Sequence, residues 1–233
     1  MTGRNRQLAF DLPHRQALGR DDFLVTGSNA AAVALVDQWP AWPSKAAMLV
    51  GPPGSGKSHL AEVWRQRAEA KFARAQDVQV ENAPELLSGG ALALEDASET
   101  ALDETALFHL LNLAKQQSAS LLLTSQTRPQ QWKISLPDLA SRLRALPLVE
   151  ILPPDDALLR GVLVKLFLDR QIAPEETTVS FMLTRMPRSL EAARALVAEI
   201  DRRAWEEKAE VTRPFVTRIM SNFNAPKLFN EDE

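Results

Sequence analysis

Short apolar segments alternate with longer amphipathic stretches through much of the sequence. Mainly apolar runs with the length of buried strands occur at 46–50, 91–94, 121–123 and 148–152. Between them, residues 103–117 carry apolar residues at helical spacing, at Leu107, Leu110, Leu111 and Ala114. Because strands that alternate with helices form parallel sheets joined by crossover helices, this pattern predicts an α/β fold with a parallel sheet.

The rest of the pattern separates a sheet-based part from a purely helical one. Helices are expected at about 29–39 and 59–72, with a further strand at 78–80. From Asp155 onward the spacing is helical, with helices at about 155–170, 175–185, 188–207 and 211–221. We therefore predict an α/β domain over 21–153 and an all-helical lid domain over 154–223, with tails at 1–20 and 224–233.

The composition is that of a soluble globular protein, with 45% hydrophobic and 24% charged residues among 233. The sequence contains no cysteine, which excludes disulfides, thiolate metal sites and cysteine nucleophiles. No apolar run approaches the roughly 20 residues that span a bilayer, and the first residues lack the apolar stretch of a signal peptide. The expected location is cytoplasmic, without membrane contact. A net charge of −3 indicates that any contact with DNA is weak or indirect.

A glycine-bearing loop follows the apolar run 46–50 and precedes a predicted helix. Residues 51–58 read GPPGSGKS and match G-x-x-x-x-G-K-[ST] at every required position. The glycines let backbone N–H groups approach phosphates, Lys57 reaches the β- and γ-phosphates, and the Ser58 hydroxyl binds Mg²⁺. The sequence thus predicts ADP or ATP with Mg²⁺ as ligands. The expected binding residues are Gly51, Pro52, Pro53, Gly54, Ser55, Gly56, Lys57, Ser58 and His59.

An acidic pair ends the apolar run 91–94 and supplies the second half of such a site. Glu95 is expected to bind Mg²⁺ beside Ser58, and Asp96 to orient the attacking water. The alternative is a strand that simply ends in a solvated acidic turn. In P-loop proteins an aspartate usually comes first, so the order Glu95-Asp96 puts efficient hydrolysis in doubt more than binding.

With these two motifs the sequence resembles the AAA+ ATPases, and within them the DnaA group. Residues 22–29, DFLVTGSN, are similar to the DnaA segment that cups the adenine base, which implies base contacts from Phe23, Leu24 and Val25. The strand around Leu123 ends where that group carries its sensor 1 residue. The resemblance therefore implies that Thr124 or Ser125 contacts the γ-phosphate or the attacking water.

Two arginines lie in segments that resemble other AAA+ motifs. Residues 136–143, LPDLASRL, are similar to the arginine-finger segment and place Arg142 in that role. Residues 186–191, MPRSLE, resemble the opening of the sensor 2 helix, from which Arg188 would reach the phosphates. Arg142 could instead lie on a solvated face with Arg144. A cation at a helix start is unfavourable by the helix dipole, which favours a phosphate partner for Arg188.

The resemblance covers about residues 20–220, and the helix-turn-helix domain that follows in DnaA has no counterpart here. The best fit is therefore the Hda family, short DnaA homologues that promote ATP hydrolysis by DnaA. Residues 7–12, QLAFDL, resemble the sequence with which that family docks on the β sliding clamp, through Gln7, Leu8, Phe10 and Leu12. The alternative is a tail whose apolar residues fold against the body or form an edge strand.

The resemblance implies a nucleotide-bound regulator that prevents re-initiation of replication. Tethered to the clamp, it would supply Arg142 to ATP-bound DnaA. Expected partners are the β sliding clamp and DnaA, with a homodimer as a further option. The alternatives are a DnaC-like helicase loader or adaptor, and a P-loop small-molecule kinase. The choice between ADP and ATP as the active ligand, and the extent of any hydrolysis by this chain itself, stay open.

Overall fold

A computed structural model describes residues 23–98 and 103–223 of the chain. Its centre is a five-stranded sheet in the order β2-β3-β4-β1-β5, in which every neighbouring pair is parallel. The strands are β1 (Ala46–Val50), β2 (Lys71–Arg74), β3 (Ala91–Glu95), β4 (Ser120–Ser125) and β5 (Leu148–Glu150). The predicted α/β class with a parallel sheet is confirmed. Because β4 lies between β1 and β3, the carboxyl ends of β1 and β3 flank that of β4.

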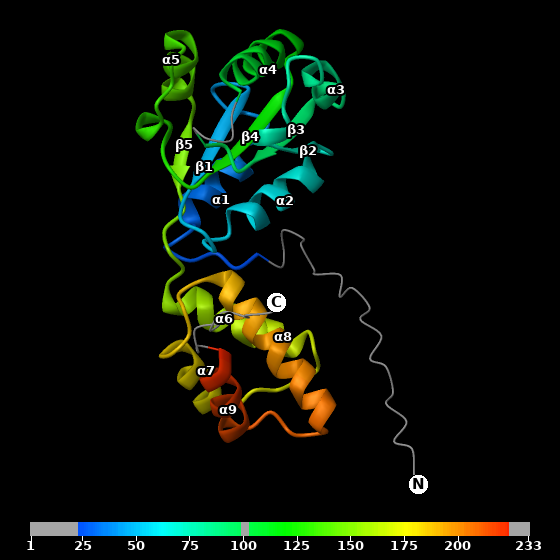
Figure 1. Ribbon diagram of the computed structural model, residues 1–233, viewed down its shortest axis with the longest axis vertical. Coiled ribbons are helices and arrows are strands. Elements are labelled where there is room, and N and C mark those ends of the chain that lie inside the picture. The colour runs from blue at the N-terminus through cyan, green and yellow to red at the C-terminus, as the bar shows by residue number, and fades with distance from the viewer. Residues whose placement is uncertain (1–22, 99–102, 224–233) are drawn as a thin grey trace, which may run out of the picture.

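Helices cover both faces of the sheet (Figure 1). One face packs on α1 (Ala30–Asp37) and α2 (Lys57–Arg67), through strand residues such as Leu49 and Leu122. The other packs on α3 (Ala83–Leu87), α4 (Glu104–Gln117) and α5 (Pro137–Ala145), through strand residues such as Met48 and Leu121. Burial on both faces explains why the central strands are continuous apolar runs rather than alternating ones.

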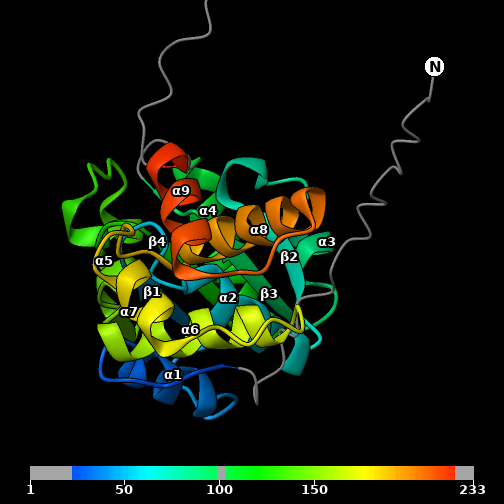
Figure 2. The same ribbon diagram turned by 90° about the horizontal axis from the view of Figure 1, so that it is seen from below.

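The C-terminal part is helical and has a hydrophobic core of its own. It consists of α6 (Asp156–Leu168), α7 (Glu176–Leu183), α8 (Leu190–Glu207) and α9 (Arg213–Phe223). These helices lie at the end of the sheet where β5 finishes, and they cover that end when the molecule is seen from below (Figures 1 and 2). None of the helices in the described ranges has both the length and the apolar character needed to cross a membrane.

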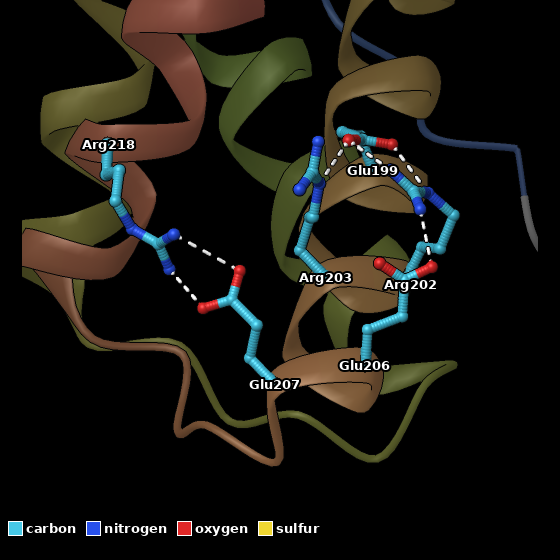
Figure 3. Close-up of polar contacts among 6 residues, drawn as sticks. All are labelled: Glu199, Arg202, Arg203, Glu206, Glu207 and Arg218. Atoms are coloured by element: carbon cyan, nitrogen blue, oxygen red, sulfur yellow. Dashed lines mark hydrogen bonds and ion pairs between the residues drawn. The ribbon is translucent and has the colours of Figure 1, made fainter. Parts of the chain in front are cut away.

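The far end of α8 carries a network of surface ion pairs (Figure 3). Arg202 bonds to Glu199 and Glu206, and Arg218 of α9 bonds to Glu207. The last of these ties α9 to the end of α8. Such exposed pairs stabilise a fold only modestly, so the buried core described above is the main attachment between these helices.

The prediction for the second strand is wrong. The strand lies at Lys71–Arg74 instead of 78–80, and α2 ends at Arg67 rather than near Phe72. The chain turns at Glu69, which adopts a left-handed backbone conformation with φ of 49°. No glycine or proline marks this turn in the sequence. The half-exposed edge strand that follows lacks the apolar run by which the inner strands were recognised.

Candidate functional site

The glycine-bearing loop connects β1 directly to α2 and is shaped by its glycines. Gly54 and Gly56 have φ of +71° and +101°, a region that other residues rarely adopt. A Cβ on Gly51 would stand 2.5 Å from the carbonyl oxygen of Ile151, so that position also excludes a side chain. No side chain caps the first turn of α2. Its free amides therefore form an anion-binding helix start.

The backbone of this loop holds the Lys57 side chain in place. The Nζ atom donates hydrogen bonds to the carbonyl oxygens of Gly51, at 2.8 Å, and Pro52, at 2.9 Å. An ammonium group has three donors, so one remains for a phosphate oxygen. Burial lowers the pKa of Lys57, and the nearby charges of Asp96 and Glu95 act against this. A charged and partly desolvated amine is thus presented beside the helix start.

Ser55 adds a second donor that fits phosphate. The residue is only 2% exposed, and its hydroxyl has no hydrogen-bond partner among the described residues. A buried hydroxyl without a partner costs free energy, and a phosphate oxygen is an acceptor that would satisfy it. The loop therefore fits a phosphate group by shape, charge and hydrogen-bonding capacity.

The acidic side of the site is assembled at the carboxyl end of β3. The Ser58 side chain lies beside the Glu95 carboxyl group and acts to lower the pKa of that carboxyl, so the two residues predicted to bind the metal are neighbours. Burial raises the pKa of Glu95 above its usual value. The Ser58 side chain opposes this rise, and the neighbouring charge of Asp96 adds to it. Asp96 has a left-handed backbone with φ of 56°, and such positions concentrate at functional sites.

The donor set fits Mg²⁺ only together with a phosphate. In the part of the chain that the structure describes, no three His, Cys, Asp or Glu side chains gather into a metal site. With a nucleotide bound, Ser58 and Glu95 would supply two oxygen ligands to the metal. In P-loop proteins, phosphate oxygens and water complete the six ligands that Mg²⁺ requires.

Thr124 and Ser125 have different roles at the end of β4, and both are buried. Thr124 accepts a hydrogen bond from the backbone N–H of Asp96 at 3.2 Å, which holds the acidic turn in place. The Ser125 hydroxyl donates to the carbonyl oxygen of Thr127 at 2.8 Å and so stabilises the turn that leaves the strand. Of the two sensor 1 candidates, Thr124 is the one in contact with the acidic pair.

The segment predicted to hold the base lies between α2 and α6. Phe23 is buried and meets the ring of His59 edge-on, with centroids 5.2 Å apart. Leu24 packs so closely on α6 that a Cβ on Gly161 would stand 2.7 Å from its Cδ1 atom. Asn29 secures this segment, because its Nδ2 donates to the Leu24 carbonyl oxygen at 2.9 Å. Val25 is 47% exposed, so it is the least enclosed of the three predicted residues.

The start of α8 contacts the phosphate loop directly, through Ser189 and Leu190, which were not among the predicted site residues. The Leu190 N–H donates to the Gly54 carbonyl oxygen at 2.9 Å, and a Cβ on Gly54 would stand 2.8 Å from the Ser189 Cβ. Farther along α8, Arg194 Nη2 lies 2.7 Å from His59 Nδ1. Ser189 is recognisable from sequence as a helix cap, but no sequence signal connects it with Gly54.

The printed partners of the two predicted arginines lie outside the loop. Arg188 pairs with Asp156 at the start of α6 at 2.7 Å, one residue before the α8 contact with Gly54. The Arg142 guanidinium lies 5.0 Å from the ring centroid of Phe108 on α4. Its helix, α5, is at the end of the sheet remote from α6–α9 (Figure 1). Residues Gln7, Leu8, Phe10 and Leu12 lie outside the described residues.

Comparison with known proteins identifies the fold. No protein-family model matches the chain. It is similar to domain III of the replication initiation protein DnaA from Thermotoga maritima, with a TM-score of 0.77 and 17% identity over 92% of this chain and 100% of that one. AMPPCP-bound DnaA from Aquifex aeolicus gives a TM-score of 0.65 and 18% identity over 80% and 65% of the two chains. The Thermotoga maritima RuvB Holliday junction branch migration motor gives a TM-score of 0.70 and 17% identity over 89% and 72%. The chain therefore has the same fold as DnaA domain III and RuvB, with a parallel-sheet core and a helical C-terminal part, as predicted.

Proposed function

We propose that this protein binds ADP or ATP with Mg²⁺ and regulates replication initiation by stimulating ATP hydrolysis on DnaA while docked on the β sliding clamp. The main support for nucleotide binding is the loop in which two backbone carbonyl oxygens fix Lys57 beside an uncapped helix start. The proposed action on DnaA is supported by the DnaA-like fold and by the lack of a carboxylate partner for Arg142 within residues 23–98 and 103–223.

The residues of the loop would divide the binding of the nucleotide between them. The free amides of α2 and the third donor of Lys57 would hold the phosphates. Ser58 and Glu95 would hold Mg²⁺, which would neutralise part of the phosphate charge. Phe23 and Leu24 would form the base side of the pocket between α2 and α6. A DnaA with the same fold is AMPPCP-bound, which supports an adenine nucleotide as the ligand.

Arg142 is proposed to act on the nucleotide of a neighbouring DnaA molecule. No carboxylate pairs with it within residues 23–98 and 103–223, and its cation–π contact with Phe108 leaves its N–H donors free. An arginine supplied in this way to the γ-phosphate of a neighbour is worth about 10³- to 10⁵-fold in hydrolysis rate. Docking of residues 7–12 on the clamp would raise the local concentration of the protein near DnaA.

Calorimetry with ADP and ATP tests the nucleotide half. We expect binding by the wild-type protein and its loss in Lys57→Ala, because the charged donor for the phosphates is removed. Lys45→Ala is the matched control, since this lysine is exposed just before β1. Absence of binding at millimolar nucleotide, or unchanged binding by Lys57→Ala, would refute the proposal.

A hydrolysis assay with ATP-bound DnaA and DNA-loaded clamp tests the regulatory half. We expect stimulation by the wild-type protein and loss of clamp binding in Gln7→Ala. An unchanged rate of DnaA hydrolysis with wild-type protein and clamp present would contradict this function. Capture of the replicative helicase instead of the clamp in a pull-down would support a helicase loader.

A further inference from the structure

A polar bridge between Arg194 of α8 and His59 of α2 joins the helical part to the nucleotide site. The two residues are 135 positions apart, and Arg194 Nη2 lies 2.7 Å from His59 Nδ1. A guanidinium has donors but no acceptor, so Arg194 donates and Nδ1 accepts. The imidazole is therefore neutral in this arrangement, with its proton on Nε2.

The surroundings of Arg194 make this bridge unusual. Burial lowers the pKa of its guanidinium, and the charge of Glu191, one turn earlier on α8, acts in the opposite direction. Over the described ranges, no carboxylate lies within ion-pair distance of Arg194. A partly desolvated arginine normally pairs with a carboxylate, and here its partner is a neutral ring. Loss of that partner would leave a partly desolvated cation without a hydrogen-bond acceptor, so the bridge favours the docked position of α8.

His59 in turn contacts two parts of the candidate nucleotide site. It directly follows Ser58, whose side chain lies beside the Glu95 carboxyl group. Its ring meets Phe23, the base-side residue, edge-on at 5.2 Å. The same stretch of α8 also contacts the phosphate loop, through the bond from the Leu190 N–H to the Gly54 carbonyl oxygen. α8 thus contacts the phosphate side of the site through Leu190 and, through Arg194 and His59, its base side.

We propose that Arg194 is a positioning residue that keeps α8 docked on the phosphate loop through His59 and thereby slows nucleotide release. This inference rests on the nucleotide-binding half of the proposed function. A nucleotide held between the loop, the Phe23 segment and α8 leaves faster when α8 undocks. The bridge contributes to the barrier to release because undocking breaks it.

Release of a fluorescent ADP analogue, followed by stopped flow on the full chain, tests this proposal. We expect Arg194→Met, which keeps the length of the side chain but removes its donors, to release the analogue about tenfold faster, as for loss of a hydrogen bond with a charged partner. Arg203→Met is the matched control, because Arg203 is an exposed arginine on the same helix that bonds to Glu199 (Figure 3). Its release rate should equal that of the wild type. A wild-type rate in Arg194→Met would overturn the proposal.

A double-mutant comparison tests the route through His59. In a His59→Leu background, the Arg194→Met change should produce no further acceleration, because its partner is already absent. The same tenfold factor in both backgrounds would show that Arg194 acts independently of His59. Arg194→Lys keeps a charged donor, so it should release the analogue more slowly than Arg194→Met, and equal rates would count against the bridge.

Hydrogen exchange without nucleotide separates failure of this inference from failure of the proposed function. The Leu190 amide lies in the first turn of α8 and is protected by the Gly54 carbonyl oxygen. We expect it to exchange faster in Arg194→Met, while amides of β1 and β4 remain as in the wild type. Unchanged protection of Leu190 would overturn the docking role. A wild-type protein that binds no nucleotide would instead refute the proposed function, and the exchange result would still report on the bridge.

Discussion

Gly54 offers a direct test of the contact between the phosphate loop and α8. Its φ of +71° lies in the left-handed region, and a Cβ there would stand 2.8 Å from Ser189 Cβ and closer still to Ser189 Oγ. Gly54→Ala therefore introduces two separate costs. The backbone strain of a non-glycine residue in this region is about 1–2 kcal/mol. The methyl group must also push the start of α8 away, which breaks the bond between the Leu190 N–H and the Gly54 carbonyl oxygen.

A matched glycine separates the two costs. Gly90 has a similar φ of +79°, and nothing lies within 4 Å of a Cβ built on it. Gly90→Ala should thus lower the free energy of unfolding by the backbone term alone, about 1–2 kcal/mol. The hydrogen bond lost in Gly54→Ala adds about 0.5–1.5 kcal/mol. We expect a total of roughly 1.5–3.5 kcal/mol for Gly54→Ala, by addition of the two terms.

Urea denaturation without nucleotide and calorimetry with ADP provide the assay. Gly90→Ala should bind ADP like the wild type, whereas Gly54→Ala should bind it more weakly. Adding Ser189→Gly to Gly54→Ala should restore the steric part of the loss, because glycine also serves as a helix cap at little cost. Equal destabilisation by the two alanine variants, together with unchanged ADP affinity of Gly54→Ala, would show that the contact with α8 has no energetic role.

Three further predictions concern Glu95, Gly161 and Arg142. Burial raises the folded-state pKa of Glu95 above its usual value of 4.5, so its contribution to stability is present below pH 4.5 and is lost as the pH rises through the folded pKa. Glu95→Gln should remove this decline in urea midpoints measured across pH, and an unchanged pH profile would contradict the assignment. Gly161→Ala should weaken ADP binding in calorimetry, because the new methyl group would stand 2.7 Å from Leu24 Cδ1 and displace that side chain. The effect on stability should be smaller, since alanine in the middle of a helix is about 0.5–1 kcal/mol more favourable than glycine. Unaltered affinity would argue against Leu24 as a base contact. Arg142→Ala should reduce stimulation of DnaA hydrolysis about 10³-fold and leave the protein's own ADP binding intact; retained stimulation would exclude Arg142 as the arginine finger.

Much of the sheet and of the phosphate loop follows from local sequence patterns. Strands buried on both faces must be continuous apolar runs, so β1, β3 and β4 are recognisable without any tertiary information. The loop needs glycines, a lysine and a hydroxyl at set spacing, and all are neighbours in the chain. The edge strand β2 was not predicted, because it is partly exposed and follows a turn at Glu69 that contains no glycine.

The partners of the site residues depend on contacts between distant segments. Nothing in the sequence near Arg188 indicates that this arginine pairs with Asp156. Nor does the sequence of β4 show that Thr124, rather than Ser125, holds the acidic turn. The bridge between Arg194 and His59 crosses 135 positions and exists only because α8 packs across the start of α2. Periodicity and motif spacing record which residues share a face or a loop. Which faces meet is settled by the packing of the whole chain, and that packing joins the helical part to the phosphate loop.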